Sequence, residues 1–100
     1  MMSEIIMSNK SLYLVQSNFS ATPSVLTKLE QLYSPEDSVI LMGESVLQFQ
    51  QPFLQQLNCL YVLETDAEIL AGQKTENMKI ISYAEFADIC LNHTRCIRLN

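Results

Sequence analysis

The sequence predicts an α/β fold, a three-layer sandwich with a mostly parallel five-stranded sheet in the middle. Five short runs are predominantly apolar, which is typical of strands buried on both faces. Segments with helical spacing or helix-capping residues separate these runs, and such alternation favours parallel strands joined by crossover helices. The chain of 100 residues contains only 2 glycines and 3 prolines, so long linkers are not expected. We therefore expect a single domain over residues 11–100, after a loose leader at residues 1–10.

The first half of the chain holds two of the predicted strands, at residues 12–15 and 38–42. A helix between them should begin at Thr22, a plausible N-cap, because Pro23 suits the first helical position. The apolar residues that follow recur at the spacing of one buried helix face. They are Val25, Leu26, Leu29, Leu32 and Tyr33. The polar segment 34–37, which contains a proline, should end this helix.

The second half begins with a glutamine-rich segment at residues 44–58, which we expect to be helical with a break near Pro52. Three further strands are expected at residues 60–63, 78–81 and 96–99. Two capping boxes, each a Ser or Thr followed three residues later by Glu, predict the starts of two helices. They are Thr65 with Glu68, and Ser82 with Glu85. Gly72 should end the first of these helices.

The composition excludes several classes of protein. Six Lys and Arg against eleven Asp and Glu give a formal charge of −5, and the basic residues are scattered, so no direct nucleic-acid binding is expected. No apolar run reaches the roughly 18 residues of a membrane span, and the N-terminus lacks the regions of a signal peptide. An odd number of cysteines, 3, argues against a disulfide framework and suits the cytoplasm.

A search for reactive groups finds no catalytic, cofactor-binding or metal-binding constellation. The glycines, Gly43 and Gly72, cannot form a phosphate-binding loop. Amides of the segment 16–21 could bind an anion at a helix start, or simply cap the helix. The chain has no C-x-x-C motif and a single histidine, so no plausible zinc set can be written.

Each cysteine has a structural interpretation and a chemical one. Cys59, before a strand, and Cys90, on the apolar face of the last helix with Phe86, Ile89 and His93, should be small buried apolar residues. Cys96 beside Arg95 is the best candidate for a lowered pKa, although a structural role is open for it as well. His93 should interact with the dipole at the end of the last helix, since the sequence shows no partner for general-base catalysis.

The second half of the chain also carries a recognisable series of short motifs. They are Leu60-Tyr61-Val62-Leu63, Asp66 to Gly72, Lys79 to Phe86 with its Tyr83-x-x-Phe86 pattern, and His93 before the last strand. The series resembles the DsrH/TusB family, and the layout of the first half agrees, so the resemblance spans residues 11–99. Family members often carry Ser-Pro where this chain has Asn18-Phe19, and the frequent terminal tryptophan is missing.

The resemblance implies a DsrE-like fold and a place in a hetero-hexamer with DsrE/TusD-like and DsrF/TusC-like subunits. Such an assembly resembles a persulfide relay that serves the 2-thiolation of the wobble uridine of tRNA. In sulfur-carrying relatives a cysteine follows the third strand at a helix N-terminus, where the helix dipole favours thiolate. The matching residues here are Glu64-Thr65-Asp66, which include no cysteine and two carboxylates. By this comparison the chain is not the persulfide carrier.

The leading hypothesis is a non-catalytic subunit of a cytoplasmic sulfur-relay complex, without cofactor, direct nucleic-acid contact or membrane contact. The alternatives are a small sulfurtransferase that uses Cys96 or Cys90, a sulfur-oxidation (Dsr-type) relay subunit, and an uncommitted homo-oligomeric α/β protein. For a subunit, we expect the partner interface in the glutamine-rich segment around Phe49, Pro52 and Phe53. Phe49 should be an interface residue, whereas Phe53 could equally belong to the core.

Overall fold

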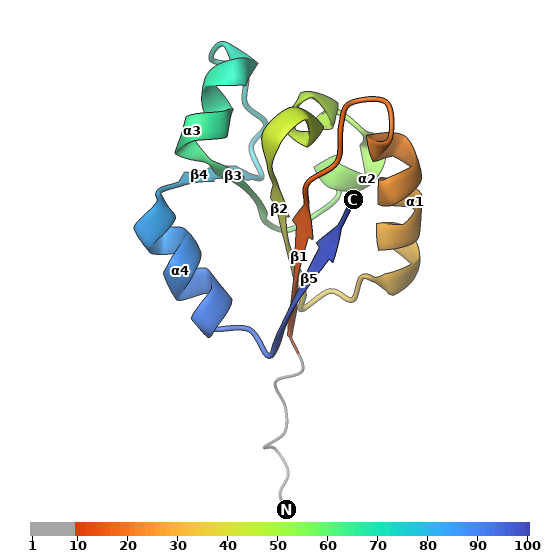
Figure 1. Ribbon diagram of the computed structural model, residues 1–100, viewed down its shortest axis with the longest axis vertical. Coiled ribbons are helices and arrows are strands. Elements are labelled where there is room, and N and C mark those ends of the chain that lie inside the picture. Colours follow the sequence, from red (N-terminus) through yellow and green to blue (C-terminus); the bar gives the residue numbers. More distant parts are fainter. Residues whose placement is uncertain (1–9) are drawn as a thin grey trace, which may run out of the picture.

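A sheet of five parallel strands forms the middle layer of the molecule, which confirms the predicted α/β fold (Figure 1). The computed structural model describes residues 10–100, so the expected leader lies, apart from Lys10, outside the described residues. The strands are β1 (Ser11–Val15), β2 (Ser38–Leu41), β3 (Leu60–Leu63), β4 (Met78–Ile81) and β5 (Arg95–Leu99). They lie in the order β4-β3-β2-β1-β5. All carboxyl ends therefore meet at one edge of the sheet, and all amino ends at the opposite edge.

Helices of very different length connect the strands. They are α1 (Thr22–Leu32), the 3-10 helix η2 (Gly43–Gln48), α2 (Pro52–Gln55), α3 (Glu64–Ala67), the 3-10 helix η3 (Glu68–Leu70) and α4 (Tyr83–Leu91). The glutamine-rich segment is interrupted as expected, because α2 starts at Pro52 after η2 has ended. No helix in the part of the chain that the structure describes is long and apolar enough to cross a membrane.

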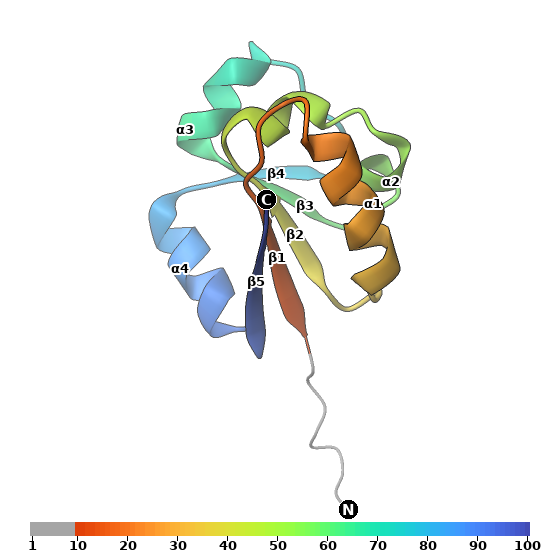
Figure 2. The same ribbon diagram turned by 45° about the vertical axis from the view of Figure 1, so that its right-hand side comes forward.

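The helices cover the two faces of the sheet unequally. The chain steps from β1 to β4 in one direction and then returns across the sheet to β5, so α4 lies on the face opposite α1 (Figure 2). The α1 face carries the larger buried cluster. The smaller cluster under α4 has as its buried members Leu12, Ile40, Leu63 and Ile81. No residue of α4 or β5 is buried, so neither element contributes a buried side chain to the core.

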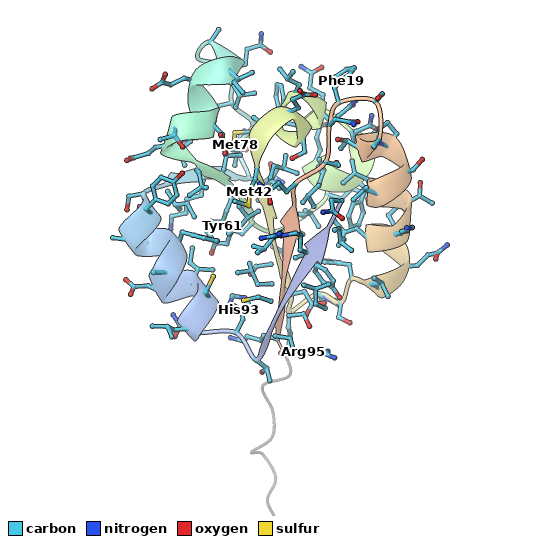
Figure 3. All side chains as sticks on the ribbon, viewed as in Figure 1. Phe19, Met42, Tyr61, Met78, His93 and Arg95 are labelled. Carbon is cyan, nitrogen blue, oxygen red and sulfur yellow. The ribbon has the colours of Figure 1, made fainter. Side chains whose placement is uncertain are left out.

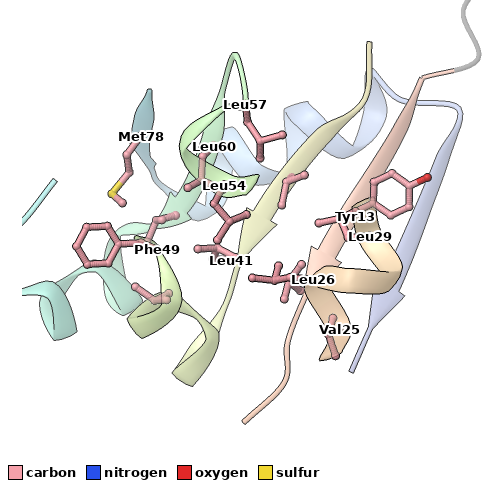
Figure 4. Close-up of a cluster of buried hydrophobic side chains, with 14 of the residues drawn as sticks. Tyr13, Val25, Leu26, Leu29, Leu41, Phe49, Leu54, Leu57, Leu60 and Met78 are labelled. Carbon is pink, nitrogen blue, oxygen red and sulfur yellow. The ribbon is translucent and has the colours of Figure 1, made fainter. Parts of the chain in front are cut away.

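The larger cluster includes Phe49, which shows that the prediction of an interface role for this residue is wrong. Phe49 is 7% exposed and shares the cluster with Met78 (Figure 4). Because the Phe49 amide donates to the carbonyl of Val46 at 3.1 Å, η2 closes at this residue, whose ring packs in the core. Phe53 is partly buried against the same cluster, and its ring meets that of Tyr33 edge to face with centroids 5.7 Å apart.

The start of α1 differs from the prediction that Thr22 is its N-cap. Thr22 belongs to the helix, and Ala21 takes the N-cap position without a side-chain cap. The buried hydroxyl of Thr22 donates instead to the carbonyl of Asn18 at 2.7 Å. The Asn18 side-chain oxygen in turn accepts from the Ala21 amide at 2.8 Å, so an earlier polar residue satisfies this amide.

Of the two predicted capping boxes, one forms and one does not. β3 runs directly into α3, so Leu63 takes the N-cap position and the box predicted from Thr65 is absent. Ser82 does cap α4, because its Oγ accepts from the Glu85 amide at 3.1 Å while the Glu85 carboxylate accepts from the Ser82 amide at 2.8 Å. Gly72 follows the left-handed cap of η3 and has φ +88°, as a terminating glycine should.

Candidate functional site

The carboxyl edge of the sheet gathers short segments from three different connections. The loop after β1 (residues 16–21), η2 after β2, and α3 with η3 after β3 all lie at this edge (Figure 1). In parallel α/β sheets, functional sites form here because loops from separate strands converge. We therefore take this edge as the candidate site and describe it residue by residue.

Phe19 lies in the loop after β1 with its backbone held by two side chains of η2. Its amide donates to Glu44 Oε1 at 2.8 Å, and its carbonyl accepts from Gln48 Nε2 at 3.2 Å. The ring is nevertheless 49% exposed, and it lies at the end of the molecule opposite to His93 (Figure 3). The chain thus fixes the backbone of an aromatic residue while leaving its ring open to solvent.

Two more large apolar side chains are exposed on neighbouring segments of this edge. Leu47 of η2 is 44% exposed and Ile69 of η3 is 46% exposed, and these two short helices contact each other. We call Phe19, Leu47 and Ile69 the carboxyl-edge surface. The exposed carboxylates of Glu44 and Glu68 belong to the same two helices. Sequence reasoning missed this surface, for which the available signal was an aromatic residue in an otherwise polar loop.

Two amides of the loop 16–21 near the start of α1 donate within the chain, which supports the capping alternative over anion binding. The Phe19 amide donates to Glu44, and the Ala21 amide donates to Asn18. The carboxylate of Glu44 would also repel an anion that approached Phe19. The amides of Phe19 and Ala21 are therefore already used and not free to bind an anion.

Buried hydroxyl groups fasten this edge to the sheet. Ser45 is fully buried, and its Oγ lies 2.8 Å from the Val15 carbonyl oxygen and accepts from the Met42 amide at 3.0 Å. Ser17 Oγ and Thr22 Oγ1 are 2.8 Å apart and also buried. These hydroxyls link backbone segments, and none of them faces solvent as a nucleophile would.

The resemblance assigns the position of the cysteine in sulfur-carrying relatives to the first turn of α3. This turn consists of Glu64, Thr65 and Asp66, directly after β3. Glu64 and Thr65 are exposed, and the turn carries two acidic residues. The helix position expected from the resemblance is therefore present, but it offers carboxylates, which disfavour a neighbouring thiolate, in place of a thiol.

The three cysteines lie near the opposite, amino edge of the sheet. Cys59 precedes β3, Cys90 is near the end of α4, and Cys96 is the second residue of β5. Cys96 is exposed, whereas Cys59 and Cys90 are partly buried, which corrects the expectation that both are buried. A thiol at the carboxyl edge is thus absent from the described residues.

Arg95 does not face Cys96, although the two residues are adjacent in sequence. Successive side chains of a strand point to opposite faces. Arg95 pairs with Ser11 in the sheet register and therefore shares the α1 face with Tyr13. Burial and the charge of Asp37 raise the pKa of Tyr13, and the charge of Arg95 partly offsets them. Cys96 pairs with Leu12 in the sheet register and shares the α4 face with it.

His93 has a structural position between α4 and β2. Its Nδ1 lies 2.6 Å from the Ile89 carbonyl oxygen, and its Nε2 lies 3.1 Å from Ser38 Oγ. Because a carbonyl only accepts, Nδ1 donates, and this contact at the end of α4 agrees with the predicted interaction with the helix dipole. Among the residues that the structure describes, no group of His, Cys, Asp and Glu could hold a metal ion.

Comparison with protein-family models places these features in one family. A family model described as DsrH like protein matches residues 16–96, from the end of β1 into β5. A search of curated proteins found no match. The matched region includes the motifs that carried the resemblance seen in the sequence, namely Leu60 to Leu63, Asp66 to Gly72, Lys79 to Phe86, and His93. The chain therefore belongs to the DsrH-like family, whose members are sulfur-relay proteins.

Proposed function

We propose that this chain is a non-catalytic subunit of a cytoplasmic sulfur-relay complex that supports 2-thiolation of the wobble uridine of tRNA. Its partners are DsrE/TusD-like and DsrF/TusC-like subunits, with which it forms a hetero-hexamer. The observation that carries the proposal is the first turn of α3, where Glu64-Thr65-Asp66 stands at the position of the sulfur-carrying cysteine. A partner subunit then carries the persulfide, and this chain completes the assembly.

The charge of the chain supports a role without direct contact to tRNA. Its formal charge is −5, and exposed carboxylates lie at the carboxyl edge on Glu44, Glu64 and Glu68. Such a surface repels a phosphate backbone. In this proposal a partner holds the RNA.

We place the main partner contact on the carboxyl-edge surface. Interface cores favour aromatic side chains, and residues with a fixed backbone lose little conformational freedom on binding. Phe19 meets both conditions, because Glu44 and Gln48 hold its peptide groups while its ring stays open. Phe49, the earlier candidate, cannot serve without unfolding the core.

Affinity purification from the native cell tests the subunit proposal. The tagged full-length chain should bring down two DsrE-like chains, and deletion of the chain should reduce 2-thiouridine in tRNA. If the wild-type chain purifies without such partners, the subunit proposal is wrong. If partners are present but tRNA thiolation is unaffected by deletion, a Dsr-type relay of sulfur oxidation becomes the better assignment.

A pair of matched substitutions tests the contact surface. Phe19→Asp should lower partner recovery by roughly tenfold or more, because a charge would replace an aromatic anchor at the interface. Leu91→Asp is the control, since Leu91 is 84% exposed but lies at the end of α4, away from this surface. Both variants should keep the circular dichroism spectrum of the wild type. Equal partner recovery by both variants would show that the carboxyl-edge surface is not the contact.

A cysteine-dependent sulfurtransferase remains the second candidate, and the exposure of Cys96 favours it. In that case Cys96→Ser would abolish tRNA thiolation in cells while the protein stayed abundant. In the subunit proposal, thiolation persists in this variant.

A further inference from the structure

Cys90 and Cys96 approach each other from different elements on the α4 face of the sheet. Cys90, near the end of α4, packs against the cluster that contains Leu12. Cys96 of β5 is the register partner of Leu12, so both cysteines lie beside the cluster to which Leu12 belongs. The two thiols also influence each other, since Cys96 is among the causes that raise the pKa of Cys90. Two thiols in such contact meet the first requirement for a disulfide bond.

The two thiols differ in a way that assigns them different roles. Cys96 is exposed, whereas Cys90 is partly buried. Burial raises the pKa of the Cys90 thiol, and the hydrogen bond to Cys96 and the charge of Cys96 raise it further. Cys96 is therefore the thiol that a reagent in solution meets first, and Cys90 stays protonated beside it.

We propose that Cys90 and Cys96 form a redox-active dithiol that reacts with low-molecular-weight disulfides of the glutathione class and closes to an intramolecular disulfide. The Cys96 thiolate attacks one sulfur of the reagent, and a mixed disulfide forms as the first reagent thiol leaves. Cys90 then loses its proton and attacks the Cys96 sulfur, which releases the second reagent thiol. Two cysteine thiols are oxidised and one reagent disulfide is reduced to two thiols, so electrons and protons balance.

The first step also prepares the second. Once Cys96 is in a mixed disulfide it carries no charge, so its contribution to the raised pKa of Cys90 disappears. Cys90 then ionises more readily at the moment when it must act as the nucleophile. The order of attack follows from the exposure of Cys96 and the partial burial of Cys90.

The disulfide would fasten an edge strand of the sheet to the helix that precedes it. It would join α4 to β5, neither of which has a buried residue. The bond closes only the short loop from residue 90 to residue 96, so its entropic effect is at the lower end for disulfides. We expect the melting temperature of the oxidised chain to rise by roughly 5–10 °C and to fall back on reduction.

The experiment uses the reduced full-length chain and an excess of oxidised glutathione. Intact mass spectrometry should show a short-lived glutathione adduct, followed by a species that has lost two hydrogens, and peptide mapping should join Cys90 to Cys96. Cys90→Ser should stop at a stable adduct on Cys96, with Cys90→Ala as the replacement if serine unfolds the chain. Cys59→Ser is the matched control and should close like the wild type.

Three outcomes would overturn the proposal. They are a stable glutathione adduct on Cys96 in the wild-type chain, a disulfide that includes Cys59, and a covalent dimer through Cys96. Closure of the Cys90–Cys96 bond without the expected gain in melting temperature would refute the proposed stabilisation of α4 against β5. None of these outcomes depends on whether the chain joins a relay complex.

Discussion

Replacement of Phe49 by alanine should destabilise the isolated domain severely. The ring is 7% exposed and belongs to the main buried cluster, where its removal leaves a cavity beside residues of η2 and the sheet. Truncation of a buried phenylalanine costs about 3–5 kcal/mol, and we expect about 3 kcal/mol here because a little of the ring reaches solvent. For a domain of this size, such a loss lowers the melting temperature by roughly 12–24 °C.

Urea denaturation followed by circular dichroism measures this loss directly. The urea concentration at the midpoint should fall, while the slope of the free energy of unfolding against urea stays the same, because the variant exposes the same surface on unfolding. Phe19→Ala is the matched control, since Phe19 is 49% exposed, and it should change stability by about 0.5 kcal/mol or less. A Phe49→Ala variant as stable as Phe19→Ala would refute the assignment of Phe49 to the core.

Two further predictions concern polar groups. Asp37→Ala should lower the free energy of unfolding by roughly 3 kcal/mol, because the Asp37 carboxylate accepts from the amides of Ser11 and Ser34, each at 2.9 Å. Thermal or urea denaturation measures this loss, and a near-neutral effect would contradict the role of Asp37. Burial, with the contact to Cys59, raises the pKa of Tyr61 to about 12. The unfolded chain has an ordinary tyrosine pKa of about 10, so this stabilisation is complete below pH 10 and is lost as the pH rises from 10 toward 12. Urea denaturation at several pH values between 10 and 12 should show this loss of stability, and the Tyr61→Phe variant should lose less over the same range. A variant whose stability falls with pH as steeply as that of the wild type would contradict the raised pKa.

The strands could be predicted well from the sequence because each is a short, predominantly apolar run, and in β1, β2 and β3 the burial of almost every residue explains that run. All five observed strands lie within one residue of the predicted ranges, and β3 and β4 match them fully. Ser82 was recognisable as a cap because its hydrogen bonds are made with Glu85, a residue of the same turn. Local patterns decided these elements, so the sequence was sufficient.

The sequence-based predictions were wrong where tertiary packing determines the position of a residue. Phe49 lies among uncharged polar residues that resemble an interface, yet the 3-10 helix η2 turns its ring into the core. Thr65 has the spacing of a capping box, but the buried Leu63 ends β3 and starts α3 at once. The hydrogen bonds that hold Phe19 connect the loop after β1 to η2, and the proximity of Cys90 and Cys96 brings α4 beside β5. Both depend on how separate elements pack, so no local pattern of the sequence predicts them.

Mapping of persulfides on the native complex tests most directly whether this chain supports the relay without carrying sulfur. The complex is loaded with its physiological sulfur donor, persulfides are trapped by alkylation, and each cysteine of each subunit is assigned by mass spectrometry. We expect sulfane sulfur on a partner cysteine and none on Cys59, Cys90 or Cys96. A stoichiometric persulfide on Cys96 or Cys90 during turnover would contradict the non-catalytic role and establish the chain as a sulfur carrier.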